Sequence, residues 1–185
     1  MVDRNRDNHE RDTVPSILVT GATGHLGRLI VEGLLRDGVA PADITAGGRR
    51  VDKLADLSAR GVRVERVDYD DPGTLAAALA GRDTLMLVSS SVPGNRLAQH
   101  GAAIDAAVAA GVTRIVYTSA PHATTSELVL APDHKATEEL IAASGIPATI
   151  LRNNWYTEVY LGALEQARET GVVTASAGDG RVASA

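Results

Sequence analysis

The chain has 185 residues, of which 44% are hydrophobic, and its formal net charge at pH 7 is −5. That length and composition suit one domain with a proper core, and the acidic balance argues against a general nucleic-acid binder, whose phosphate contacts need a basic face. The absence of cysteine excludes a disulfide framework, a thiolate metal site and a cysteine nucleophile.

Residues 1–14 are predicted to be a disordered extension, because they carry too little apolar surface to offset the entropy of ordering. They lack the apolar segment of a signal peptide, and no apolar run in the chain approaches the roughly 20 residues that a membrane helix needs. The sequence therefore predicts a cytoplasmic protein with no membrane segment, in which residues 15–185 form one domain.

Residues 16–20 are a short apolar run with β-branched side chains, which predicts a buried parallel strand. Apolar residues at helical spacing over 25–37 predict an amphipathic helix directly after it. Between them, Gly21, Gly24 and Gly27 have the spacing Gly-x-x-Gly-x-x-Gly, a variant of the dinucleotide-binding pattern. Gly21 would permit the sharp turn, Gly24 would let phosphates approach the backbone, and Gly27 would let the helix pack on the strand. A dinucleotide site is therefore predicted here, and an ordinary loop before a helix is the alternative.

Strand and helix signals alternate along the rest of the chain, which predicts an α/β fold: a Rossmann-type doubly wound parallel sheet with helices on both faces. Further strands are expected at residues 43–48, 62–67, 84–88, 112–118, 147–151 and 172–175. Helices are expected at residues 52–60 with Asp52 as the cap, 71–80, 95–110, 133–144, and from the polar turn 152–157 to about residue 170. Alternating apolar and charged side chains make 62–67 an expected edge strand, and the fully apolar 84–88 an expected central one. Because no closing helix follows the last expected strand, we expect a truncated domain whose C-terminal substrate part is missing or incomplete.

The residues after the strand at 43–48 indicate the nucleotide preference. NAD-specific proteins usually have Asp or Glu there, about 20 residues past the glycine turn, whereas this chain has Arg49 and Arg50. A guanidinium suits a 2′-phosphate, so we predict NADP(H), with Arg49 as the main contact and Arg50 or Lys53 in support. Two solvated surface arginines are the alternative. Asp68 stands where such folds bind adenine, or it is an ordinary turn aspartate.

The sequence lacks the Tyr-x-x-x-Lys pair of the best-known short-chain dehydrogenases, in which the lysine lowers the pKa of the tyrosine so that it can transfer a proton. The residues at the fourth position after the four tyrosines are Gly73, Pro121, Tyr160 and Leu164. A proton relay of that spacing is therefore absent.

A family resemblance is carried by the glycine turn, the arginine after the second strand and five further segments, at residues 89–91, 116–119, 122–123, 135–141 and 151–156. Together they resemble the NmrA-like atypical short-chain dehydrogenases, and within these the bacterial NADPH-dependent quinone reductases. The likeness runs from about residue 17 to the end. Members are typically longer, with a C-terminal part that completes the substrate cleft. The resemblance implies hydride transfer from NADPH to a quinone or similar small-molecule acceptor. The absence of the Tyr-x-x-x-Lys pair fits such a quinone reductase better than an alcohol dehydrogenase, because hydride transfer to an electron-poor ring needs little acid–base assistance.

Two other functions remain as alternatives. One is a redox-sensing regulator of the NmrA type, which binds the dinucleotide without turning it over and acts through protein partners. The other is an isomerase or lyase that retains a tightly bound cofactor. A homodimer is compatible with each of these, though nothing in the sequence selects it.

The resemblance also implies roles for individual positions. The expected pyrophosphate contacts are Gly21, Thr23, Gly24, His25, Leu26 and Gly27, and Arg49 is the expected contact of the 2′-phosphate. The residues expected along the nicotinamide ribose are Ser89, Ser90 and Ser91. The residues expected to flank the nicotinamide and the substrate mouth are Arg152, Asn153, Asn154, Trp155 and Tyr156. Trp155, the only tryptophan, is either a lid over a flat ligand or a packing anchor.

Three residues are candidates for proton transfer. Lys135 aligns with a lysine that related plant reductases use as a general base, or it forms a surface ion pair at helical spacing. Tyr117 could donate a proton, or it is a core tyrosine with a satisfied hydroxyl. His122 lies near the expected cleft, or it is an exposed loop histidine. The five histidines show no metal-ligand spacing, so we expect no metal.

Overall fold

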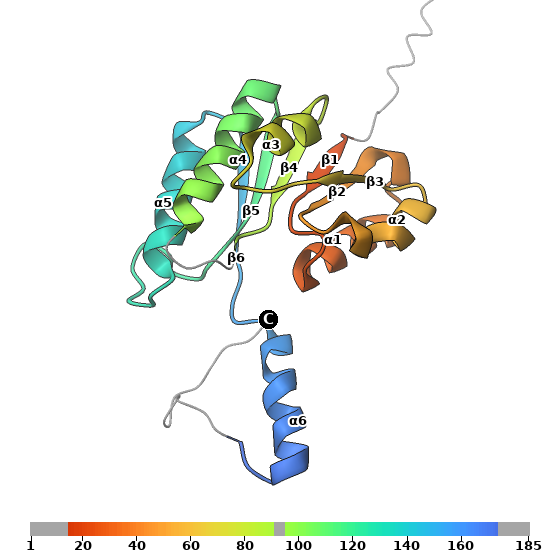
Figure 1. Cartoon of the computed structure of the whole chain (residues 1–185). Helices are drawn as coiled ribbons and strands as arrows, with labels where there is room; N and C mark the ends of the chain where they lie inside the picture. The colour runs from red at the N-terminus through yellow and green to blue at the C-terminus, as the bar shows by residue number, and fades with distance from the viewer. Residues whose placement is uncertain (1–14, 91–94, 174–185) are drawn as a thin grey trace, which may run out of the picture.

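The computed structural model describes residues 15–90 and 95–173. Its centre is a six-stranded sheet with the order β3-β2-β1-β4-β5-β6, and every neighbouring pair runs parallel (Figure 1). The strands are β1 (Ile17–Val19), β2 (Ile44–Gly48), β3 (Arg63–Arg66), β4 (Thr84–Leu87), β5 (Arg114–Ser119) and β6 (Ala148–Arg152). The order reverses at β1, which is the arrangement of a doubly wound sheet. The predicted Rossmann-type fold is confirmed, with β3 at the edge and β4 in the centre as expected.

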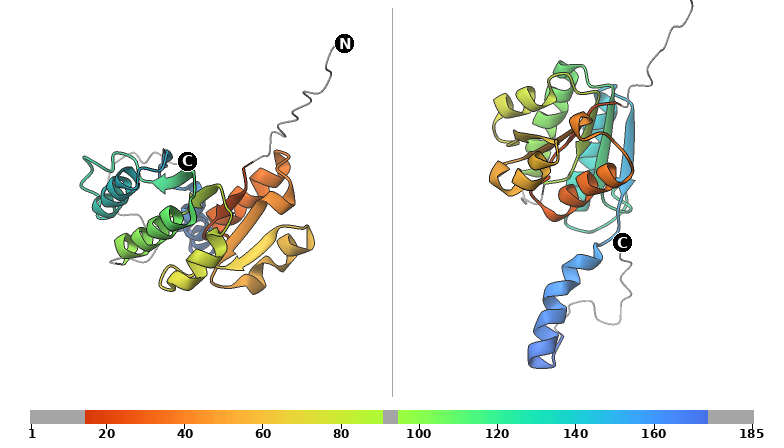
Figure 2. Two further views of the ribbon diagram at one scale, coloured as in Figure 1. Left: turned by 90° about the horizontal axis from the view of Figure 1, so that it is seen from above. Right: turned by 90° about the vertical axis from the view of Figure 1, so that its right-hand side faces the viewer.

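Helices cover both faces of this sheet (Figure 2). The α-helices of the described residues are α1 (His25–Arg36), α2 (Ala55–Ala59), α3 (Pro72–Leu79), α4 (Arg96–Ala110), α5 (Ala131–Ala143) and α6 (Leu161–Thr170). Short 3-10 helices are η1 (Pro41–Asp43), η2 (Val51–Leu54) and η3 (Thr157–Tyr160). α1 and α2 lie on one face, and α3, α4 and α5 lie side by side on the other. The opposite sides follow from right-handed crossovers that run outward from β1 in two directions.

Two hydrophobic clusters fill the space between these layers. Adjacent β1 residues serve both, since Leu18 belongs to the cluster under α3–α5 and Val19 to the cluster under α1 and α2. Successive strand side chains point to opposite faces, so a sheet covered on both sides needs the apolar run that the sequence shows. The polar carboxyl ends of the strands, where the core stops, are left for a ligand.

Four sequence expectations need correction or fall outside the described residues. The helix expected at 52–60 is split into η2 and α2, and Asp52 is not its cap: it lies inside η2 and its carboxylate accepts from Arg50 at 3.0 Å. α5 begins at Ala131 rather than 133, because Pro132 fits in a first helical turn, where its missing N–H has no partner to lose. Val172 and Val173 are not in a strand, and residues 174–175 lie outside the described part, as do residues 1–14.

The chain leaves the sheet after β6 through η3 and continues into α6, which extends away from the sheet (Figures 1 and 2). α6 contains no buried residue, and its side chains Leu161 and Leu164 are more than half exposed. The core of the domain therefore forms without α6. None of the helices in residues 15–90 and 95–173 is long and apolar enough to cross a membrane.

Candidate functional site

A cavity of about 310 Å³ opens at the carboxyl ends of β1, β2, β3 and β4. This is where ligands bind in open α/β sheets, beside the point at which the strand order reverses. The lining residues that the sequence predicted are Gly21, Thr23, Gly24, His25, Leu26, Gly27, Arg49, Asp68, Ser89, Ser90 and Tyr156. The lining residues that it missed are Gly48, Val67, Tyr69, Val88 and Gln99. The cavity thus brings together segments that lie far apart in the chain.

The glycine turn at residues 21–27 has a shape that only glycine permits. Gly21 has a φ of +63°, and a Cβ on Gly27 would lie 2.3 Å from the carbonyl oxygen of Gly21. Gly24 is the N-cap of α1 and has no side-chain cap, so the first N–H groups of the helix are left for an anion. The turn suits an anion such as a pyrophosphate, because its glycines bring the backbone N–H groups to the cavity wall and the helix dipole favours negative charge.

The cavity wall at the end of β2 is built from Gly48 and Arg49. A Cβ on Gly48 would lie 2.6 Å from Cγ2 of Thr23, so the end of β2 packs directly on the glycine turn. Arg49 follows as an exposed residue on the cavity wall, and no ion pair of Arg49 is recorded among the described residues. Arg50 lies outside the cavity and pairs with Asp52 at 3.0 Å. Lys53 lines a neighbouring hollow instead.

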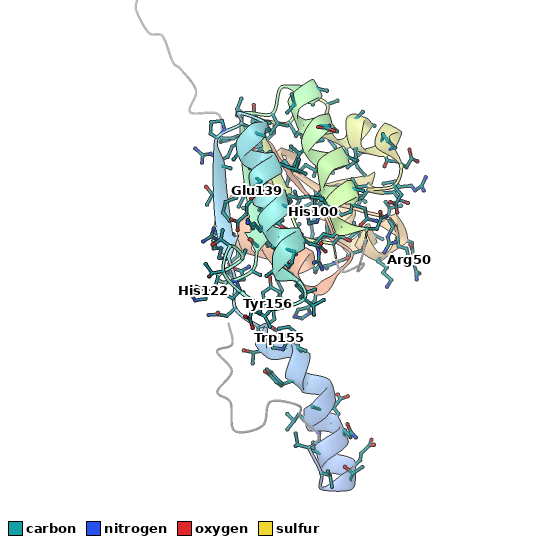
Figure 3. The ribbon with its side chains drawn as sticks, turned by 90° about the vertical axis from the view of Figure 1, so that its left-hand side faces the viewer. Arg50, His100, His122, Glu139, Trp155 and Tyr156 are labelled. Atoms are coloured by element: carbon teal, nitrogen blue, oxygen red, sulfur yellow. The ribbon has the colours of Figure 1, made fainter. Side chains whose placement is uncertain are left out.

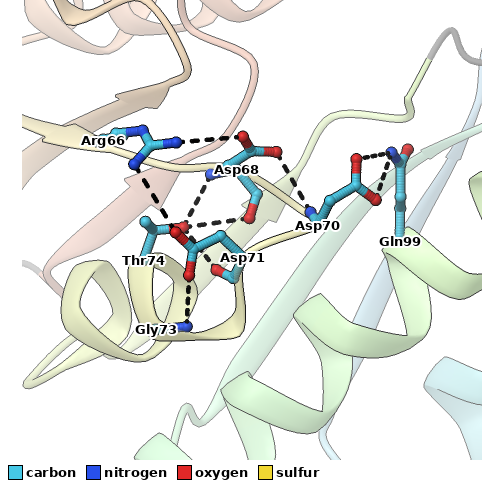
Figure 4. A network of polar contacts seen from close by, with 7 residues as sticks. All are labelled: Arg66, Asp68, Asp70, Asp71, Gly73, Thr74 and Gln99. Atoms are coloured by element: carbon cyan, nitrogen blue, oxygen red, sulfur yellow. Dashed lines mark hydrogen bonds and ion pairs between the residues drawn. The ribbon is translucent and has the colours of Figure 1, made fainter.

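Asp68 lines the cavity after β3 and also holds the turn there, and contact with adenine stays a prediction. Its carboxylate accepts from the backbone N–H of Asp70 at 3.3 Å and lies 3.5 Å from Arg66 (Figure 4). Its own N–H donates to Thr74 Oγ1 at 3.0 Å. This turn fixes the wall of the cavity beside β3.

Tyr69 forms the wall between the β3 and β4 ends. Its hydroxyl lies 2.7 Å from Thr20 Oγ1 and 2.9 Å from the carbonyl oxygen of Val88. Burial of the phenol raises the pKa of Tyr69 to about 12, so it stays protonated at neutral pH. The backbone N–H of Val88 donates to the same Thr20 hydroxyl at 2.9 Å. These bonds fix the point at which the chain leaves β4 for Ser89 and Ser90.

Of the five residues expected at the carboxyl end of β6 to flank the nicotinamide, Tyr156 alone lines the cavity. Arg152 forms two hydrogen bonds with Glu138, at 3.0 and 2.6 Å; these lower the pKa of that carboxyl. Asn153 Nδ2 donates to Tyr156 Oη at 3.1 Å, whereas Asn154 and Trp155 are exposed. Figure 3 shows Trp155 and Tyr156 between the sheet and α6. Ser91 lies outside the described residues.

None of the three proton-transfer candidates lines the cavity. Tyr117 is fully buried and its hydroxyl lies 2.7 Å from His134 Nδ1; burial raises the pKa of this phenol. Lys135 Nζ lies 3.9 Å from Glu139, and His122 is an exposed loop residue with a φ of +52°. These positions agree with the alternatives that the sequence left open, and a catalytic role for any of the three stays a prediction. Residues 15–90 and 95–173 contain no group of three His, Asp or Glu side chains that could hold a metal.

A buried histidine beside the cavity makes the stability of the domain depend on pH. His100 is fully buried, and burial lowers its pKa from 6.5 to about 3. The folded state then binds fewer protons than the unfolded state between these two values. The free energy of unfolding is therefore highest above pH 6.5. It falls as the pH is lowered, by about 2 kcal/mol at pH 5. Urea unfolding at pH 7.5 and pH 5 measures this loss, and His100→Gln should make it smaller by about that amount. An equal loss in the variant would contradict the assignment to His100.

Comparisons with known proteins agree with this geometry. The protein family described as NAD(P)H-binding matches residues 21–183. Quinone oxidoreductase 2 of Escherichia coli is 47% identical over 169 residues, which are 91% of this chain and 59% of that protein. The crystal structure of the E. coli NADPH-dependent quinone oxidoreductase complexed with NADPH has a TM-score of 0.85 at 47% identity, and the match covers 91% of this chain and 59% of that one. An NmrA-like oxidoreductase of Aspergillus flavus is 31% identical over 76% of this chain and 48% of its own length.

The chain spans less than two thirds of the length of each of these relatives. The family match over residues 21–183 contains the glycine turn, strands β2 to β6 and the residues that line the cavity. The chain therefore belongs to the NAD(P)H-binding family, as an NmrA-like relative of the quinone oxidoreductases.

Proposed function

We propose that this chain is the cofactor-binding part of an NADPH-dependent oxidoreductase that reduces a quinone or a similar electron-poor acceptor. The observation that carries the proposal is Arg49, a guanidinium on the cavity wall beside a strand end made of glycine. A carboxylate at this place would bind the 2′-hydroxyl of NAD, whereas a guanidinium pairs with the 2′-phosphate of NADP. The E. coli relative was crystallised with NADPH, which supports the same preference.

The lining residues divide the cavity along the length of the cofactor. The N–H groups at the start of α1 would bind the pyrophosphate. Arg49 and Asp68, after β2 and β3, would hold the adenosine 2′-phosphate and the adenine. Ser89 and Ser90 follow β4 on the other side of the strand reversal, so they would hold the nicotinamide half.

NADPH supplies a hydride when it is bound. A quinone ring that accepts this hydride gains two electrons, and one proton from solvent or from a side chain then completes the hydroquinone. The chain has to orient the two rings and to stabilise the negative charge that develops on the acceptor oxygen. Tyr156 suits the second task, because Asn153 donates to its oxygen and leaves the phenol hydrogen to point elsewhere.

We expect Tyr156→Phe to lower kcat for a small benzoquinone by about tenfold or more, since one hydrogen bond to a developing charge is lost. NADPH affinity should change little. Tyr160→Phe is the matched control, because Tyr160 is exposed and does not line the cavity. Stopped-flow measurement of NADPH oxidation distinguishes the two variants, and an unchanged kcat in Tyr156→Phe would remove Tyr156 from this role.

The proposed function is tested by mixing the chain of residues 1–185 with NADPH and a small benzoquinone and following the near-ultraviolet absorbance of NADPH. Quinone-dependent oxidation well above the rate without protein supports an oxidoreductase. Calorimetric binding of NADPH without such oxidation would contradict catalysis by this chain and would favour the regulator of the NmrA type.

A further inference from the structure

Ser90 is held by three side chains from the first two turns of α4. Its N–H donates to His100 Nε2 at 3.0 Å, its hydroxyl donates to Gln99 Oε1 at 2.6 Å, and its carbonyl oxygen accepts from Arg96 Nε at 2.7 Å. The main-chain donor, the main-chain acceptor and the side chain of one cavity residue are thus each bound. We call Arg96, Gln99 and His100 the Ser90 clamp.

The Ser90 clamp is buried although its side chains are polar. Arg96, Gln99 and His100 are each exposed by 5% or less. Burial of a charged or polar side chain is unfavourable unless it is hydrogen-bonded, so their place inside an alanine-rich helix interface needs a reason. If packing were their only role, leucine or alanine could fill the same positions.

α5 fixes the orientation of two members of the clamp. Asp133 Oδ2 lies 3.3 Å from Arg96 Nη1, and Thr137 Oγ1 lies 3.0 Å from His100 Nδ1. The Thr137 hydroxyl donates to the carbonyl oxygen of Asp133 at 2.8 Å, so it accepts from His100. The N–H of Ser90 can only donate, and the imidazole is therefore neutral, with its hydrogen on Nδ1 and its acceptor Nε2 toward Ser90.

The third member, Gln99, connects the clamp to the turn after β3. The Gln99 amide N–H₂ donates to both carboxylate oxygens of Asp70, at 3.1 and 3.0 Å (Figure 4). These two hydrogen bonds fix the orientation of the Gln99 amide, so that its oxygen faces Ser90. Asp70 follows Asp68 in the turn after β3, so the clamp joins the turn on the adenosine side to the residues after β4.

We propose that the Ser90 clamp positions Ser90 for the nicotinamide half of NADPH, with His100 as a positioning residue that does not itself line the cavity. This inference rests on the proposed function. Ser90 lies on the cavity wall after β4, beyond the strand reversal from Arg49, where the nicotinamide half would lie. A displacement of about 1 Å at such a contact is enough to impair binding and hydride transfer.

The test compares two ligands by isothermal titration calorimetry on the full chain. NADPH contains the nicotinamide half, and adenosine 2′,5′-bisphosphate lacks it. We expect His100→Leu to weaken NADPH binding about three- to tenfold, the value of one hydrogen bond, and to leave the affinity for the bisphosphate unchanged. His100→Gln, whose amide oxygen can accept from Ser90, should restore much of the NADPH affinity. Ile104→Val, a buried change one turn further along α4, should lower stability without changing either affinity.

If His100→Leu does not fold, Thr137→Val removes the acceptor that orients His100 and should give a selective loss for NADPH in the same direction. Equal weakening of both ligands, or no weakening of NADPH, in the folded variant would overturn the role of the clamp. An unmodified chain that binds neither ligand would overturn the proposed function and this inference with it. The affinities of the unmodified chain therefore distinguish failure of the proposed function from failure of the clamp's role alone.

Discussion

Gly27→Ala is expected to reduce NADPH affinity at least about tenfold and to destabilise the domain by about 1–3 kcal/mol. The added Cβ would lie 2.3 Å from the carbonyl oxygen of Gly21 and 2.8 Å from the backbone nitrogen of Ala22. Both contacts are with backbone, which cannot rotate away as a flexible side chain would. α1 must therefore move away from the glycine turn, and the N–H groups that would bind the pyrophosphate move with it. Calorimetry with NADPH and urea unfolding measure the two effects.

The same helix offers a matched control. Gly33 also lies inside α1, but a Cβ there would meet only Nη2 of Arg36 at 3.6 Å, an ordinary contact. Gly33→Ala should stabilise the domain by about 0.5–1 kcal/mol, because alanine loses less backbone entropy in a helix, and should leave NADPH affinity unchanged. Parent-like binding by Gly27→Ala would show that close packing of α1 on the turn is not needed for the cofactor.

The glycine turn could be predicted from the sequence because its physics is local. Strand, turn and helix are neighbours in the chain. The positive φ at Gly21 is a conformation that favours glycine, so the residue type itself indicates the turn. The same is true of Asp71, whose side chain caps α3 by accepting from the N–H of Gly73. Asp52 has the same residue type but binds Arg50 instead. The preference of aspartate for helix N-caps therefore does not predict its role where a side-chain partner lies two residues away.

The wall formed by α4 was missed because its contacts join distant residues. The sequence predicted only a helix over residues 95–110 there. A signal was present: Arg96, Gln99 and His100 are polar and fall on one helical face by their spacing. The residues near this face in the sequence do not indicate whether it contacts Ser90 or solvent. That depends on how α4 packs between α3 and α5. Tyr69 was missed for the same reason, since its partner Thr20 lies across the sheet.

Arg49→Ala is expected to weaken NADPH binding by about 1–3 kcal/mol and to leave NADH binding nearly unchanged. The guanidinium lies on the cavity wall after β2, where it would pair with the 2′-phosphate that NADH lacks. Titration with each nucleotide gives the two free energies directly. Adenosine 2′,5′-bisphosphate should lose as much affinity as NADPH, because the lost contact belongs to the adenosine half.

Arg50→Ala is the comparison that makes this result specific. Arg50 is the adjacent arginine and carries the same charge, but it lies outside the cavity and pairs with Asp52. If general positive charge attracted the cofactor, the two variants would lose similar affinity, and both losses would shrink as salt is added. If Arg49 binds the 2′-phosphate in a bidentate contact, its loss is several times larger and persists in salt, because a direct pair is screened less than a distant charge. An equal loss for NADH in Arg49→Ala would contradict the assignment of Arg49 to the 2′-phosphate.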